Sequence, residues 1–209
     1  MNLLEWENTF LEFYKSYTFE DASHDIYHFK RVWKTARLIL ENESADELVI
    51  LAGCYFHDIV SFEKNDPRRS ESSKIAAIKT GEILTELDFP KDKIDAVKHC
   101  VEAHSFSANI ETKTIEAKIV QDSDRMEAIG AIGIARCFYT AGRMKSELFH
   151  PENPLGENRD LDDKKYALDH FKVKLLKLPE TMQTESGKKL AQERAEVLTQ
   201  FMNQLNSEI

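Results

Sequence analysis

The chain of 209 residues is 42% hydrophobic and 31% charged, and its 28 basic and 37 acidic side chains give a formal net charge of −9. This length suits one ordinary domain, or one domain with a helical appendix. A composition with seven glycines and five prolines is typical of a helix-rich globular protein. The net negative charge argues against a nucleic acid duplex as partner, because the phosphate backbone attracts positively charged protein surfaces. A small anionic substrate stays open if a metal ion and a few basic residues reverse the field locally.

Neither a membrane span nor a secretory leader is expected. The apolar runs fall short of the roughly 18 residues that a membrane-spanning helix needs, and residues 1–7 place no basic region before an apolar one. Cys54, Cys100 and Cys137 are far apart in the sequence and lie among apolar neighbours. This pattern predicts reduced core thiols in a reducing compartment, and therefore a cytoplasmic protein.

The first two predicted helices bring one histidine into an apolar stripe. Aromatic and aliphatic residues at helical spacing predict a helix over 3–17, and the polar segment 20–23 ends it and can cap the next helix. That helix begins near His24 and carries His24, His28 and Arg31 on one face, at i, i+4 and i+7. An isolated histidine on such a stripe is more often structural, so the rest of the chain decides whether His28 belongs to a site.

The adjacent residues His57 and Asp58 close a third predicted helix, over 46–60, directly after an apolar run. A buried carboxylate beside an imidazole is unfavourable without a partner, and a divalent cation is the simplest one. The loop that follows carries Lys64, Arg68 and Arg69. These basic residues place positive charge close to the His-Asp pair, although solvated loops often contain such residues.

Helices are also predicted over 70–88 and 92–105. The expected buried side of the first consists of Ile75, Ala76, Ile78, Ile83, Leu84 and Leu87. In the second, His104 continues the apolar face at i+3 from Val101 and should therefore point inward. Taken alone, such a histidine is more often structural than functional.

Residues 114–141 read as one long helix or a kinked pair. Asp124 shares a face with Val120 and should point inward, where a carboxylate needs a cation or several hydrogen-bond donors. Gly130 and Gly133 each disfavour a helix by about 1 kcal/mol relative to alanine, and we expect them to permit close helix contact.

The last third of the chain is expected to pack on the first part. Residues 142–160 form a long connection that is expected to cover the site as a lid. A helix is predicted over 161–178, ended by Pro179, and Thr184 is expected to cap a last helix that runs to about Leu205. The predicted organisation is one domain over 1–209, with a core at about 20–140 and C-terminal helices within 160–206.

Four inward polar residues from three predicted helices can therefore form a metal site: His28, the adjacent His57 and Asp58, and Asp124. Two imidazoles and two carboxylates suit an octahedral or nearly octahedral divalent ion with open positions. The mixed ligand set favours Mn²⁺, Fe²⁺, Co²⁺ or Ni²⁺ over Mg²⁺, whereas a structural zinc site more often recruits cysteine. An open site indicates catalysis, because the ion can acidify a bound water and polarise a phosphoryl oxygen.

This order of residues resembles the HD superfamily of metal-dependent phosphohydrolases, over nearly the whole chain. The stretch 24–32 is similar to the family's first motif, and 122–127 to its last. In that last motif the aspartate before the basic residue is the ligand, which selects Asp124 over Asp122. The segments 169–176 and 182–187 resemble a bacterial subfamily of small stand-alone HD-domain hydrolases.

The resemblance implies an all-α HD-domain bundle with one central divalent ion, Mn²⁺ by preference and Mg²⁺, Co²⁺, Ni²⁺ or Fe²⁺ otherwise. It also implies hydrolysis of a phosphate ester or anhydride in a nucleotide or another phosphorylated metabolite, by a monomer or a homodimer. Some nucleotidase branches carry an acidic residue three positions after the His-Asp pair. Ser61 stands there in this chain, so that catalytic carboxylate is not carried over.

The expected mechanism is attack on phosphorus by a water that the ion activates, with Asp58 and His104 as the catalytic side chains. His104 gives a proton to the leaving oxygen or stabilises its charge, an effect of about 10²- to 10⁴-fold for such groups. The side chains expected to hold the substrate's phosphates are Lys64, Arg125 and Arg31, with bracing of its own helix as the alternative for Arg31. Asp122 is expected to orient the metal ligands.

Three other readings stay open. Some HD-fold proteins hold two irons and act as oxygenases, which requires more ligands than the four placed here. A non-catalytic sensor would bind a nucleotide with the metal site intact. A plain helical scaffold would carry these polar residues by coincidence. Substrate range is expected to depend on the loops 61–70 and 142–160.

Overall fold

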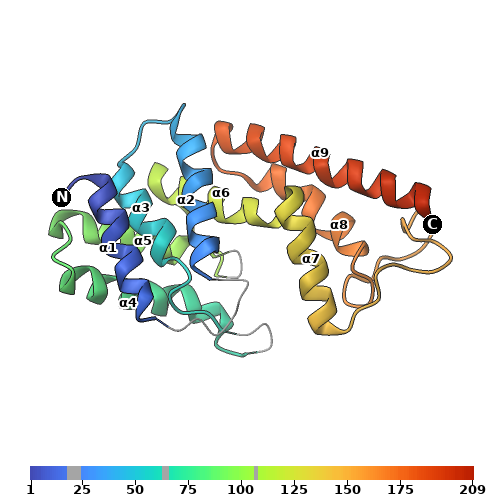
Figure 1. Cartoon of the computed structure of the whole chain (residues 1–209), viewed down its shortest axis with the longest axis horizontal. Coiled ribbons are helices and arrows are strands. Elements are labelled where there is room, and N and C mark those ends of the chain that lie inside the picture. The colour runs from blue at the N-terminus through green and yellow to red at the C-terminus, as the bar shows by residue number, and fades with distance from the viewer. Residues whose placement is uncertain (18–24, 63–65, 106–107) are drawn as a thin grey trace. The chain divides into compact units, whose positions relative to one another are not determined.

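A computed structural model describes residues 1–17, 25–62, 66–105 and 108–209 (Figure 1). All regular elements in these ranges are helices, so the predicted all-α fold is confirmed. The α-helices are α1 Leu3–Lys15, α2 Ile26–Leu40, α3 Glu47–Phe56, α4 Ser72–Glu86, α5 Ile94–Ala103, α6 Ile115–Arg125, α7 Gly130–Met144, α8 Asp169–Val173 and α9 Glu185–Glu208. Short 3₁₀ helices are η2 Arg69–Glu71, η3 Lys91–Lys93, η4 Met126–Ala128 and η5 Leu175–Thr181. The predicted cap at 20–23, His24 and Lys64 lie outside the described residues.

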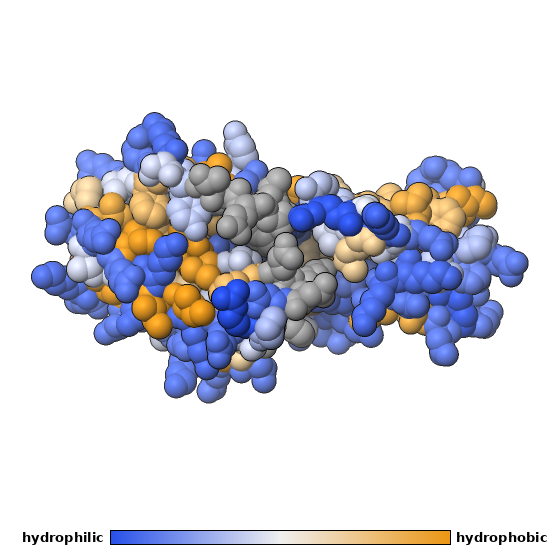
Figure 2. Space-filling model, turned by 90° about the horizontal axis from the view of Figure 1, so that it is seen from below, coloured by the Kyte–Doolittle hydropathy of each residue, from blue (hydrophilic) through white to orange (hydrophobic). Residues whose placement is uncertain are grey.

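The chain divides into two compact units, residues 1–124 and 125–209. Each is described here by itself, and a single domain over 1–209 stays a prediction. Within the described ranges, none of the helices is both long and apolar enough to cross a membrane. On the face drawn in Figure 2, hydrophilic residues predominate and hydrophobic residues lie between them in smaller groups.

Helix α3 forms the centre of the first unit. All eight residues from Val49 to Phe56 are buried, as expected for a helix that is apolar on every side. Helices α1, α2 and α5 pack against it. A Cβ built on Gly53 would lie 2.9 Å from Val120 and 3.1 Å from Cys100, so this glycine lets α5 and α6 approach α3 closely. Gly53 was not among the glycines that were expected to permit close helix contact, which are Gly130 and Gly133.

Gly130 and Gly133 instead serve the turn into α7. Gly130 has a φ of +72°, in the left-handed region that glycine adopts without strain, and a Cβ on Gly133 would collide with the backbone of Ala128. The region 114–141 is therefore a kinked pair, α6 and α7, joined by η4 and the extended residue Ile129.

Two details of the predicted helices are wrong. Ile75 and Ile78 are exposed, because α4 buries the face that contains Ser73, Ala77 and Thr80 instead. Residues 161–168 form turns and not a helix, so that only the short α8 and η5 follow before Thr184. The Thr184 side chain accepts a hydrogen bond from Gly187 N and caps α9, as predicted.

In the second unit, Asp169 fastens the connection between α7 and α8. Its two carboxylate oxygens accept hydrogen bonds from Arg159 Nη1 and Nη2 at 2.6 and 2.7 Å, and Oδ2 also accepts from Asp162 N at 2.7 Å. Burial alone would raise the pKa of Asp169, but Arg159 and the Asp162 amide outweigh it and lower the pKa. The connection is therefore held by a buried, charged pair.

We expect Asp169→Asn to lower the thermal midpoint by about 5 °C or more, since it removes the charge that pairs with Arg159. Because the folded pKa of Asp169 is lowered, its contribution is present above the unfolded value of about 4 and lost as the pH falls through the folded value. Thermal melts at pH 7 and pH 3 should therefore show a difference from the native chain that shrinks in acid. Asp160→Asn, with the same change of charge at an exposed position of the loop, is the control.

Candidate metal centre

The His-Asp pair lies in the turn that follows α3, not within the predicted helix over 46–60. The helix ends at Phe56, and His57 is its C-terminal cap. Carbonyl groups at a helix C-terminus lack hydrogen-bond partners within the helix. Here two tyrosine side chains supply such partners at and just after the end of α3. Tyr14 donates its hydroxyl to Tyr55 O at 2.7 Å, and Tyr17 donates to Ile59 O at 2.8 Å. These bonds from α1 and the residues after it fix the backbone that carries the pair.

The structure brings together all four predicted ligands. One ligand atom of each of His28, His57, Asp58 and Asp124 lies within 4.8 Å of the others. The two Nε2 atoms are 3.1 Å apart. Asp124 Oδ1 is 3.6 Å from the Nε2 of His28 and 3.5 Å from that of His57, and the corresponding distances to Asp58 Oδ2 are 3.9 and 3.6 Å. Both histidines are fully buried.

The hydrogen bonds of His57 indicate that this cluster needs a positive charge. Its Nδ1 lies 2.9 Å from Cys54 O, so we assign the proton to Nδ1 and the lone pair of Nε2 to the centre. That lone pair faces two carboxylate oxygens, from Asp58 and Asp124, which is repulsive unless a proton or a cation lies between them. The donor set of two imidazole nitrogens and two carboxylates fits a divalent ion such as Mn²⁺.

The ionisation of the cluster agrees with this reading. Burial alone would lower the pKa of His57, but the charges of Asp58 and Asp124 raise it to about 9. Burial alone would raise the pKa of Asp124, yet its hydrogen bond and attraction to His57 lower it. Without an ion, the cluster therefore gathers a proton, and an ion would take the place of that proton.

His104 lies beside the cluster, with its ring centroid 4.9 Å from that of His57, and contacts the second carboxylate oxygen of Asp58. It follows α5, is 6% exposed, and its Nδ1 lies 2.6 Å from Val101 O. Its Nε2 is 3.3 Å from Asp58 Oδ1, while Asp58 Oδ2 faces the other two histidines. The group of four ligands found among the described residues does not contain His104. Asp58 thus connects the metal site to a fifth polar side chain.

Gln121 is a supporting residue that sequence reasoning missed. It is buried on α6, three positions before Asp124, and its Nε2 donates to Ala103 O at 2.7 Å. This bond holds the end of α5, from which His104 projects. The available signal was a polar residue on the same helix face as Asp124.

The remaining predicted site residues are placed as follows. Asp122 is fully buried on α6 and Arg31 is half-buried on α2. Arg125 belongs to the second unit, where its Nη1 donates to Thr181 O at 2.6 Å. The predicted substrate contacts of Arg31 and Arg125 stay predictions, as does the orienting role of Asp122.

Comparisons with known proteins agree on one family. A family model described as HD domain matches residues 25–129. The uncharacterized protein YpgQ of Bacillus subtilis is 33% identical over 196 residues, which cover 92% of this chain and 87% of that protein. The crystal structure of YpgQ in complex with ADP superposes with a TM-score of 0.77 at 30% identity, covering 99% of this chain and 96% of that one. A crystal structure of an HD-superfamily hydrolase from Bacillus thuringiensis gives a TM-score of 0.76 at 30% identity, with coverages of 98% and 97%.

Proposed function

The chain belongs to the HD-domain family, and from this premise we propose that it is a metal-dependent phosphohydrolase that cleaves a phosphate ester or anhydride of a nucleotide. The observation that carries the proposal is the convergence of two buried imidazoles and two carboxylates from three separate parts of the first unit. Such a set leaves positions open for water and substrate on an ion of octahedral preference.

His28, His57, Asp58 and Asp124 would hold one divalent ion, with Mn²⁺ preferred because the ligands mix nitrogen and oxygen. When bound, the ion supplies positive charge that polarises a phosphoryl oxygen and lowers the pKa of a coordinated water. The Nδ1 contact of His57 with Cys54 O keeps its Nε2 directed at the centre, so the protein orients this ligand before any ion arrives.

His104 is the proposed proton donor to the leaving oxygen. Its Nδ1 is held by Val101 O, so the ring presents Nε2, 3.3 Å from Asp58 Oδ1. This geometry places Nε2 where it can transfer a proton to a leaving oxygen. Asp58 therefore serves both as a ligand and as the group that orients His104.

A nucleotide is the proposed substrate because YpgQ, which is similar over nearly the full chain, has been crystallised with ADP. Lys64, Arg31 and Arg125 are the proposed contacts of the phosphates. We further propose that the protein acts in the cytoplasm as a monomer or homodimer; its three cysteines are free thiols.

The test is a matrix of metals and substrates. Metal-stripped protein receives Mn²⁺, Mg²⁺, Co²⁺, Ni²⁺ or Fe²⁺, and is then incubated with nucleoside mono-, di- and triphosphates, with phosphate and pyrophosphate measured separately. We expect release of one of these products with Mn²⁺ and none from the metal-stripped protein. Two irons per chain with a requirement for oxygen would favour an HD-fold oxygenase, and nucleotide binding without turnover would favour a sensor.

A further inference from the structure

A small pocket opens beside Asp58 and His104 in the first unit. Four serines, one phenylalanine and one arginine line it together with these two residues, and its volume is about 50 Å³. A water molecule needs about 10–15 Å³ on this scale, so the pocket has room for roughly four waters. It therefore has room for a small group such as a phosphoryl group.

Ser73, one of the residues that line this pocket, carries a buried hydroxyl. It is the second residue of α4 and is 1% exposed. Within the described part of the chain, its Oγ has no hydrogen-bond partner. The neighbouring Ser72, by contrast, donates its hydroxyl to Val60 O at 2.8 Å. A buried hydroxyl without a partner is unfavourable, and in native proteins such a group calls for a functional explanation. A ligand oxygen in the pocket would supply the partner that Ser73 lacks.

The same end of α4 brings positive charge to the pocket. Arg69 is the one arginine or lysine among the lining residues that the structure describes. Its Nη1 donates to Phe62 O at 3.2 Å, which keeps the guanidinium at the pocket and leaves further N–H groups for a ligand. Helix α4 is 15 residues long, and the positive end of its dipole lies at this turn.

The carboxylate of Asp58 by itself would repel an anion in the pocket. A cation held at the metal centre, together with the contact between Asp58 Oδ1 and His104, would offset this charge. Binding of an anion to the pocket should therefore depend on the divalent cation at the metal centre. An anion bound there would lie next to the proposed reaction centre.

We propose that this pocket holds one phosphoryl group of the substrate, with Ser73 Oγ donating a hydrogen bond to a non-bridging oxygen and Arg69 pairing with its charge. The assignment rests on the proposed function, and makes Ser73 and Arg69 specificity-determining residues. It implies that the enzyme recognises its substrates by a phosphoryl group beside the metal centre.

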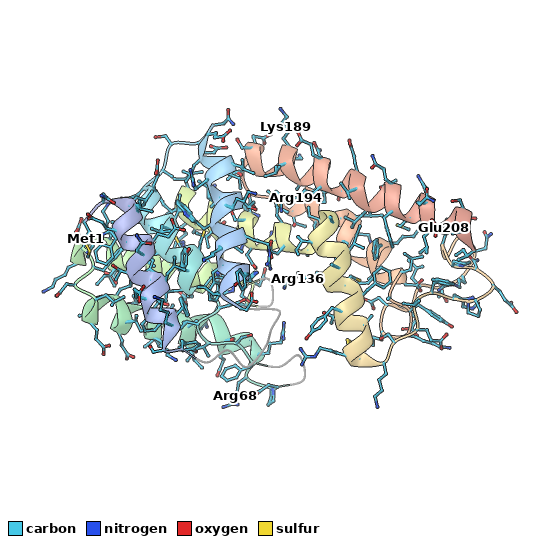
Figure 3. The ribbon with its side chains drawn as sticks, viewed as in Figure 1. Met1, Arg68, Arg136, Lys189, Arg194 and Glu208 are labelled. Atoms are coloured by element: carbon cyan, nitrogen blue, oxygen red, sulfur yellow. The ribbon has the colours of Figure 1, made fainter. Side chains whose placement is uncertain are left out.

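The test measures binding of inorganic phosphate and pyrophosphate by calorimetry to Mn²⁺-loaded and metal-stripped protein. We expect Ser73→Ala and Arg69→Ala each to weaken binding to the Mn²⁺-loaded protein by about tenfold, as for hydrogen bonds to a charged group, and metal-stripped protein to bind weakly. Ser70→Ala is the control for Ser73, because Ser70 is exposed and does not line the pocket. Arg68→Ala controls for charge: Arg68, labelled in Figure 3, pairs with Asp66 at 2.8 Å and does not line the pocket.

A thermal melt separates a ligand-binding role of Ser73 from a structural one. Removal of an unpartnered buried hydroxyl should leave the thermal midpoint of Ser73→Ala unchanged or raise it, while phosphate binding weakens. A lower midpoint together with unchanged phosphate affinity would mean that Ser73 only supports the fold, and would overturn the assignment.

The outcomes for the pocket and for the hydrolase are distinguishable. The phosphoryl assignment of the pocket is overturned if Ser73→Ala binds phosphate and pyrophosphate with unchanged affinity. It is also overturned if the native Mn²⁺-loaded protein binds neither anion. Both conclusions hold whether or not nucleotides are hydrolysed. Binding that depends on Ser73 and Arg69, without turnover of any substrate in the matrix, supports the pocket and removes the proposed hydrolase function.

Discussion

Asp124→Asn is expected to lower the affinity for the divalent ion by about 100-fold or more, and to abolish turnover at ion concentrations that saturate the native protein. Asp124 Oδ1 lies within 3.6 Å of both histidine Nε2 atoms. The asparagine keeps the shape of the side chain but replaces a charged ligand by a neutral amide, so the fold should persist. Ion affinity is measured by calorimetry, turnover by product release, and the fold by circular dichroism.

Glu116→Gln is the matched control on the same helix. Glu116 lies on α6, outside the cluster, and its Oε1 accepts a hydrogen bond from Asp46 N at 3.1 Å. The control makes the same change of charge and should leave ion affinity and turnover within about twofold, since exposed or distant charges contribute little. Full retention of ion binding and activity in Asp124→Asn would exclude the metal centre as described.

His104→Asn is expected to reduce kcat by about 10²- to 10⁴-fold while ion affinity changes little. The asparagine amide can still donate to Val101 O, as Nδ1 does, but the group near Asp58 Oδ1 is lost. A general acid acts on the leaving group in the transition state, so its loss lowers kcat more than it raises KM. Steady-state kinetics on the best substrate of the metal screen give both constants.

His99→Asn is the control for His104. His99 lies on α5, the helix that His104 follows, and its Nε2 accepts a hydrogen bond from Lys113 N at 3.0 Å, away from the cluster. Its replacement should leave kcat unchanged. If His104→Asn instead halves the metal content per chain, His104 is a metal ligand and the two-iron oxygenase becomes the better interpretation.

The four residues of the candidate metal centre were predictable because each breaks a local pattern. His28 and Asp124 interrupt apolar stripes with a helical period, and His57 with Asp58 ends an apolar run. A polar group on a buried helix face requires a partner, so the sequence identifies such residues without knowledge of the fold. For the same reason the all-α class and most helices follow from the periodicity alone.

Ser73, of the proposed phosphoryl pocket, and the supporting residue Gln121 were not predictable in this way. Ser73 has no unusual neighbours in the sequence, and it was expected that α4 would bury Ile75 and Ile78, which are exposed. Gln121 acts through a carbonyl 18 residues earlier in the chain. The roles of these residues depend on which helices lie beside them, and a one-dimensional pattern does not contain that information.

By itself, then, the sequence determined the helical class, the chain's acidic character and the four inward residues His28, His57, Asp58 and Asp124 that the structure brings together, because burial and period are properties of each segment alone. Only the tertiary structure decided that α3 ends before the His-Asp pair, that His104 contacts Asp58, and that Ser73 lines a pocket together with these two residues. The physical reason is that the end of a helix and the partners of a side chain are set by hydrogen bonds and packing from segments distant in the chain.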